Sequence, residues 1–174
     1  AELLRAGEHL LLELDAVANR VKRIATGWEP QLTIAADAII ARSTLFELCE
    51  AFYELGAPTQ LKLRAETLTG TWESVLGGSA DLALGVAADL TPSTGIALAD
   101  MGHLPFIFVV APHHPLAAVE GKLSDAQLQP HRVVAVADST QRGRSVSLGI
   151  LPGQDVLTVP TMQHKLEAQL RGLG

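Results

Sequence analysis

The first 26 residues carry apolar side chains at a spacing that fits one face of a long helix. From Leu10 to Ile24 the apolar positions are separated by gaps of four, three, four and three residues. Such a repeat is typical of a helix that packs against another helix. The full seam comprises Leu3, Gly7, Leu10, Leu14, Val17, Val21 and Ile24. A partner helix is the favoured interpretation, and an amphipathic helix lying on its own domain is the alternative.

From Gln31 the pattern changes to short apolar stretches that alternate with helical segments. It predicts strands within residues 31–40, 59–68 and 81–87, with helices over residues 41–55 and 69–80 between them. Strands and helices in strict alternation favour a parallel sheet covered by helices. The first half of the chain therefore predicts an α/β fold.

A second, similar set of elements begins near residue 105. The pattern predicts two strands that join the halves, then a short helix, two further strands and a last helix, at residues 94–102, 103–112, 123–130, 132–138, 155–160 and 161–174. Two α/β lobes of this kind leave a cleft between them. Such clefts hold small ligands at helix N-termini and strand C-termini.

Composition and charge narrow the classes of function. The net charge of −6 disfavours binding of DNA or of an anionic membrane by this segment alone. The aromatic content of 4% disfavours binding of single-stranded nucleic acid, which stacks on aromatic side chains. One cysteine, Cys49, excludes an intrachain disulfide. No signal-like segment opens this sequence, although one could have preceded it, and we expect a cytoplasmic protein.

Motifs of catalysis and of cofactor binding are missing from the sequence. It contains no glycine-rich nucleotide fingerprint, no HExxH, no CxxC and no GxSxG. The adjacent His113 and His114 would face opposite ways on a strand, which disfavours a shared metal. Ser139 follows Asp138, but no motif ties a histidine to it. We therefore expect no enzymatic activity, no metal and no cofactor.

Polar residues at predicted strand ends and helix starts are the candidate ligand-binding groups. They are Asp37, Thr69, Asp138, Ser139 and Thr161. Helix N-termini offer unpaired N–H groups and a partial positive charge. If the two lobes face each other, these residues meet at one cleft. The alternative is that each hydroxyl only caps its helix.

The ordered series of motifs resembles the linker helix and effector-binding domain of LysR-type transcriptional regulators. The stretch "RAGEHLLLELDAVANRVKRIATG" resembles the linker helix, and "ESVLGGSADLALG", "FIFVVAPHHPLA" and "VPTMQHKLEAQLRGLG" resemble stretches that follow in that family. The resemblance implies two Rossmann-like lobes of the periplasmic-binding-protein type, joined by crossing strands. It places the linker helix at residues 1–29, lobe I at 30–104, and a crossing strand with an incomplete lobe II at 105–174.

The resemblance also implies a function. The chain would be the effector-sensing and oligomerising part of a DNA-binding regulator, in a homodimer or homotetramer held by the linker helix. DNA would be bound by a winged helix-turn-helix that precedes this sequence. A stand-alone solute-binding protein of the same fold is the alternative, but it predicts no leading coiled-coil helix.

The family's effector contacts map onto specific positions of this chain. They fall on Asp37, Ile39, Thr69, Asp138, Ser139 and Thr161. Phe108, on a crossing strand, either lines the pocket or is buried in the core. Asp37 departs from the serine or threonine that is usual in the family, and its charge would repel an anionic effector. With Trp72 nearby in the chain, the departure favours a polar aromatic or heterocyclic effector.

Overall fold

The computed structural model describes residues 27–86, 95–141 and 145–174, together with eleven residues between Ala6 and Ala25. The chain divides into two compact units. Unit 1 comprises Ala1–Glu66 and Thr71–Val86, and unit 2 comprises Thr67–Gly70 and Ala87–Gly174. The boundary therefore crosses one helix, whose first two residues belong to unit 2.

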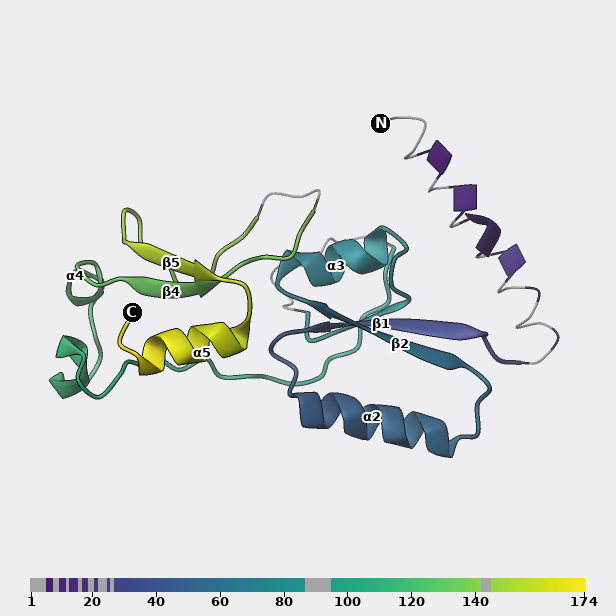
Figure 1. Cartoon of the computed structure of the whole chain (residues 1–174), viewed down its shortest axis with the longest axis horizontal. Coiled ribbons are helices and arrows are strands. Elements are labelled where there is room, and N and C mark those ends of the chain that lie inside the picture. The colour runs from purple at the N-terminus through teal and green to yellow at the C-terminus, as the bar shows by residue number, and fades with distance from the viewer. Residues whose placement is uncertain are drawn as a thin grey trace. The chain divides into compact units, whose positions relative to one another are not determined.

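The leading segment is helical, as its spacing predicts. Every described residue between Ala6 and Ala25 is in helix (Figure 1). The seam side chains within the described part are more than half exposed, at 60% for Leu10, 66% for Leu14, 56% for Val17 and 62% for Val21. Two further seam positions, Leu3 and Ile24, lie outside the described residues. An apolar stripe left open along a helix is the surface that a partner helix covers.

Unit 1 is built on a three-stranded sheet. Its strands are β1 (Gln31–Asp37), β2 (Gln60–Glu66) and β3 (Leu82–Leu84), in the order β2-β1-β3. Both pairings are parallel, which confirms the predicted sheet. The central strand is buried from Thr33 to Asp37, since it has a neighbour on each side and helices over its faces.

Helices α2 (Arg42–Glu54) and α3 (Thr69–Leu76) lie on opposite faces of this sheet (Figure 1). The connection from β1 through α2 to β2 runs one way across the sheet, and the connection from β2 through α3 to β3 runs back past β1. When both connections are right-handed, their helices lie on opposite faces. Between α2 and the sheet lies an apolar hollow of about 300 Å³, lined by Leu32, Ile34, Leu48, Cys49, Ala51, Phe52, Leu55, Leu61 and Leu82. The ring of Phe52 meets Trp28 edge to face at 6.4 Å, so the segment before β1 packs on α2.

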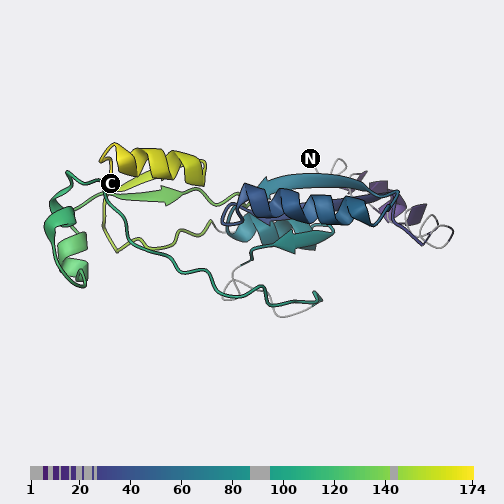
Figure 2. The ribbon, with the colours of Figure 1, turned by 90° about the horizontal axis from the view of Figure 1, so that it is seen from below.

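Unit 2 contains a second parallel pair, β4 (Val133–Val136) and β5 (Val156–Val159). Helix α5 (Met162–Leu170) packs on this pair through the buried Ala168 (Figure 2). A short helix, α4 (Asp125–Leu128), precedes β4, and the oxygen of the Gln127 side chain accepts the N–H and O–H of Ser124. These elements confirm the strands and helices predicted for residues 123–174.

Residues 95–112 form no strand in the part of the chain that the structure describes, so the two joining strands predicted there are wrong. A strand needs a neighbouring backbone to complete its hydrogen-bond ladder, and these residues pair with none of the described strands. The apolar side chains that suggested burial are exposed, among them Phe106 at 70%, Ile107 at 78% and Phe108 at 59%. The apolar character of residues 95–112 was therefore not enough to predict a strand, because a strand also needs a neighbouring strand to pair with.

None of the helices in the described ranges is long and apolar enough to cross a membrane.

Candidate functional site

A cluster of polar groups in unit 2 forms around the carboxylate of Asp138, just after β4. One oxygen, Oδ1, accepts the N–H of Gly70 at 3.1 Å and that of Thr140 at 3.1 Å. The other oxygen, Oδ2, accepts the hydroxyl of Thr69 and the N–H of Val146, the latter at 2.9 Å. A carboxylate offers about four acceptor positions in all. The acceptor capacity of Asp138 is therefore filled by the chain itself.

These contacts make Asp138 the cap of α3 from a distant part of the sequence. Thr69, the first residue of α3, donates its hydroxyl to Asp138 instead of accepting a helix N–H, so the capping alternative stated above is wrong for Thr69. Burial raises the pKa of Asp138, but the hydrogen bonds from Thr69, Val146, Thr140 and Gly70 outweigh it and hold the pKa below its ordinary value. The group is thus an ionised carboxylate at neutral pH.

Ser139 fastens the segment before α3 to the end of β4. Its Oγ accepts the N–H of Thr67 at 2.8 Å and lies 3.2 Å from the carbonyl oxygen of Thr67, to which it donates. The N–H of Ser139 also donates to that carbonyl oxygen, at 3.2 Å. A Cβ added at Gly70 would clash with the Ser139 side chain and lie 2.8 Å from its carbonyl carbon. Only glycine allows this close approach.

The residue directly before α3 adopts a left-handed backbone. Leu68 has φ +55°, the one positive φ of a non-glycine residue in the described part of the chain. This conformation is costly for a branched apolar side chain. The contacts of Thr67 and Gly70 on either side of Leu68 keep it in place.

A second cluster, in unit 1, forms around Asp37 at the end of β1. Its Oδ1 accepts the N–H of Ile39 at 3.0 Å, two residues further along, and its Oδ2 accepts the hydroxyl of Thr71 at 3.1 Å. Asp37 is 5% exposed and Thr71 is fully buried. Trp72, next to Thr71, is 4% exposed, so its ring is a core group and offers no open face for stacking.

The remaining candidates have other roles. Thr161 caps α5, because its hydroxyl oxygen accepts the N–H of His164 at 3.2 Å. Thr161 therefore has the helix-capping role that the sequence analysis gave as the alternative to ligand binding. Phe108 lies on the exposed segment that forms no strand.

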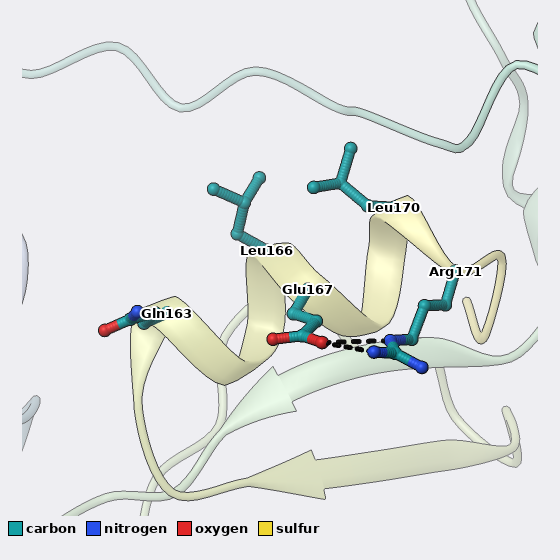
Figure 3. Close-up of a pocket in the computed structure, with 5 residues that line it drawn as sticks. All are labelled: Gln163, Leu166, Glu167, Leu170 and Arg171. Atoms are coloured by element: carbon teal, nitrogen blue, oxygen red, sulfur yellow. Dashed lines mark hydrogen bonds and ion pairs between the residues drawn. The ribbon is translucent and has the colours of Figure 1, made fainter.

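A shallow hollow of about 450 Å³ lies along the outer face of α5. It is lined by Gln163, Leu166, Glu167, Leu170 and Arg171. Figure 3 shows Leu166 and Leu170 pointing away from the strands, beside an ion pair in which Arg171 lies 2.6 Å from Glu167. The hollow has one helix as its wall. An exposed i, i+4 ion pair of this kind contributes little to stability.

Three histidines of unit 2, His113, His114 and His131, lie close to one another. The rings of His114 and His131 meet edge to face at 4.8 Å. Burial, with the nearby His131 and His113, lowers the pKa of His114. No group of three or more side chains suited to a metal ion occurs among the described residues.

Residues 25–174 match the family model described as the LysR substrate binding domain. This chain belongs to that family. The match, with the parallel α/β sheets, supports a periplasmic-binding-protein-like fold. It also confirms the prediction that this chain is the effector-binding part of a LysR-type regulator, and nothing supports a stand-alone solute-binding protein.

The relatives of this LysR domain include bacterial HTH-type transcriptional regulators. The chain is 34% identical to YeeY and 32% to YhaJ of Escherichia coli (strain K12), and 29% to AllS of Klebsiella pneumoniae, in alignments that cover 99% of it. It covers 56% of YeeY, 57% of YhaJ and 67% of AllS. The chain thus spans little more than half the length of the first two.

Sequence reasoning missed several groups of the LysR domain's clusters. Thr71 carries a hydroxyl to Asp37, and Thr67 and Val146 contribute backbone groups around Ser139 and Asp138. A backbone N–H leaves no mark in a sequence, so Val146 could not have been found. Thr71 could have been, because it lies two residues after Thr69 at a helix start.

Proposed function

We propose that this LysR domain recognises a small-molecule effector through the polar groups at its strand ends and helix starts. The residues are Asp37, Ile39, Thr69, Phe108, Asp138, Ser139 and Thr161. The observation that supports this most is the meeting of Thr69, Asp138 and Ser139 in one cluster, at the carboxyl end of β4 and the amino end of α3. Such strand ends are where α/β folds bind ligands.

The chemistry of the effector follows from the charge of these groups. The charge of Asp138 disfavours an anion, and a carboxylate at Asp37 favours a cationic or donor-rich molecule. A polar aromatic or heterocyclic compound meets that requirement. The buried ring of Trp72 adds no support for stacking, so charge is the stronger of the two arguments.

A thermal-shift screen of metabolites against the 174-residue chain tests the proposal. We expect a cationic or donor-rich class to raise the melting temperature. Asp37→Ala should weaken that response, and Asp125→Ala, which removes an exposed carboxylate on α4, should leave it unchanged. A screen in which no class of metabolite raises the melting temperature would contradict the proposal.

We propose further that residues 1–29 are a linker segment whose helix joins two or four copies, with lobe I over 30–104 and lobe II over 105–174. The exposed seam of Leu10, Leu14 and Val17 supports the pairing. Light scattering should show a smaller assembly for Leu14→Lys and an unchanged one for Glu13→Lys, a neighbour on the same helix. Equal masses for both variants would contradict it.

The intact protein, in this proposal, is a cytoplasmic regulator that binds DNA through a part outside this chain. The family is one of transcriptional regulators, and the acidic charge of −6 fits a DNA-binding surface located elsewhere. We propose no catalytic role and no cofactor. Fusing the chain to a reporter DNA-binding domain would show whether effector addition changes operator occupancy.

A further inference from the structure

The donors around Asp138 come from three separate stretches of unit 2. Thr69 and Gly70 belong to the start of α3, Thr140 follows Asp138 closely, and Val146 lies eight residues beyond it. Three backbone N–H groups and one hydroxyl aimed at a single point form a concavity that favours an anion. The anion that occupies it is the protein's own side chain.

The carboxylate is held on both oxygens. Each oxygen accepts two of the four hydrogen bonds, so a ligand could donate to Asp138 only by displacing one of these donors. An external carboxylate or phosphate would compete with Asp138 for the same donors and would be repelled by its charge. The cluster is therefore complete without an added group.

The backbone around the cluster is arranged for this contact. Gly70 approaches Ser139 so closely that a Cβ has no room, and Leu68 holds a left-handed backbone next to the donors. A strained backbone that persists beside a polar cluster indicates that the hydrogen bonds to Asp138 have a function. The strain would have no function if Asp138 were only a solvated surface carboxylate.

We propose that Asp138 is a built-in anionic ligand, whose carboxylate fills the donor cluster at the start of α3 and excludes effectors that would present a carboxylate or phosphate there. This inference rests on the proposed effector-sensing function and specifies the effector class. Asp138 acts as a specificity determinant by occupying the position of an anion.

Chemical rescue by formate tests the inference without knowledge of the effector. Asp138→Ala removes the carboxylate and leaves the donors and a space of its size. Formate at saturating concentration and constant ionic strength should raise the melting temperature of this variant by about 4 °C, since a ligand bound only to the folded state stabilises it. The wild type and Asp138→Asn, whose space stays filled, should shift by less than about 1 °C.

Two controls make the result specific. Asp155→Ala removes an exposed carboxylate that accepts from Arg132 in the same unit, and formate should not stabilise it. An equal response of all four proteins, or no response of Asp138→Ala, would overturn the inference. Failure of the metabolite screen would leave this outcome unaffected, so the two proposals fail separately.

A measurement on the wild type keeps the test decisive if Asp138→Ala does not fold. Amide resonances of Gly70, Thr140 and Val146 should not move when formate, acetate or inorganic phosphate is added at constant ionic strength. Movement of these three resonances together would show that an external anion reaches the donors, and would overturn the inference. Unmoved resonances support occupation by Asp138.

Discussion

Two aspartates occupy the same place in the two units of this chain, but their hydrogen bonds have different origins. Asp37 ends β1 and accepts the N–H of Ile39, two residues further along, and the hydroxyl of Thr71. Asp138 follows β4 and accepts donors that include Thr69 and Gly70, more than sixty residues earlier in the sequence. The first contact is partly a local turn, and the second requires distant segments to meet.

The difference also concerns how each oxygen is used. At Asp37 one described partner is a hydroxyl, which can turn to accept a hydrogen bond instead of donating one. At Asp138 both oxygens accept backbone N–H groups, which can only donate. We therefore expect an amide to be tolerated better at Asp37 than at Asp138.

Replacing each aspartate by asparagine should have the largest effect and test this comparison directly. In Asp138→Asn, the amide NH₂ faces at least one backbone N–H whichever way it is turned, and we expect a loss of about 3 kcal/mol in the free energy of unfolding. In Asp37→Asn, the NH₂ can donate to the hydroxyl of Thr71, and we expect a loss of about 1 kcal/mol. Urea denaturation of both variants measures the difference. Equal losses would remove the distinction between the two clusters.

A somewhat smaller effect is expected from Gly70→Ala, which tests the close approach beside Asp138. The added Cβ would clash with Ser139. Relieving that clash moves the start of α3 away from Asp138, and we expect the free energy of unfolding to fall by about 2 kcal/mol. The matched control is Gly7→Ala, where no atom lies within 4 Å of the added Cβ. Helix propensity predicts that this control gains about 0.5–1 kcal/mol. A neutral Gly70→Ala would show that the approach is not tight.

The regular elements could be predicted from the sequence because they depend on local patterns. Alternating apolar residues marked β1 and β2, and the polar stretch after residue 137 marked the end of β4. Asp138 and Ser139 were predicted as site residues for the same reason. Thr69 was predicted in the same site, but its direct hydrogen bond to Asp138, across 69 residues, was not, and Val146 was missed because it contributes only its backbone.

The segment around Phe108 shows the limit of apolar patterns. It has a strongly apolar sequence and yet forms no strand, since no described backbone completes its ladder. The cap of α3 shows the same limit for polar residues. A threonine at a helix start predicts its own capping bond, but a carboxylate from another segment took that role, and only the tertiary structure could reveal it.

The pH dependence of stability should separate Asp138 from its amide variant. Its pKa is held below the ordinary value in the folded state, so its contribution is complete above the unfolded pKa of about 3.9 and is lost as the pH falls through the folded pKa. The gap in unfolding free energy between wild type and Asp138→Asn should be constant from about pH 7 to 5 and shrink below about pH 4. If the difference in unfolding free energy between wild type and Asp138→Asn stayed the same below about pH 4, the stabilising cap of α3 would not be the ionised form of Asp138.

The smallest expected effect comes from a neutral cap in unit 2, which contrasts with the charged cap of α3. The Nδ1 of His114 accepts the N–H of Leu116 at 3.2 Å, at the start of the 3-10 helix Pro115–Ala118. Burial, His131 and His113 lower the pKa of His114, so the folded state favours the neutral ring. Its contribution is complete above the unfolded pKa of about 6.5 and declines as the pH falls from there toward the folded pKa.

His114→Asn keeps an acceptor at this cap and removes the titrating group. The loss of unfolding free energy between pH 7.5 and 5.5 should therefore be about 0.5 kcal/mol smaller in this variant than in the wild type. His103→Asn, on an exposed part of unit 2, serves as the matched control. If His114→Asn and His103→Asn behave alike, the ring does not act as a neutral cap. The contrast with Asp138 would then rest on acid stability alone, because a cap that requires a charge fails only when its carboxylate is protonated, several pH units below the range in which a histidine titrates.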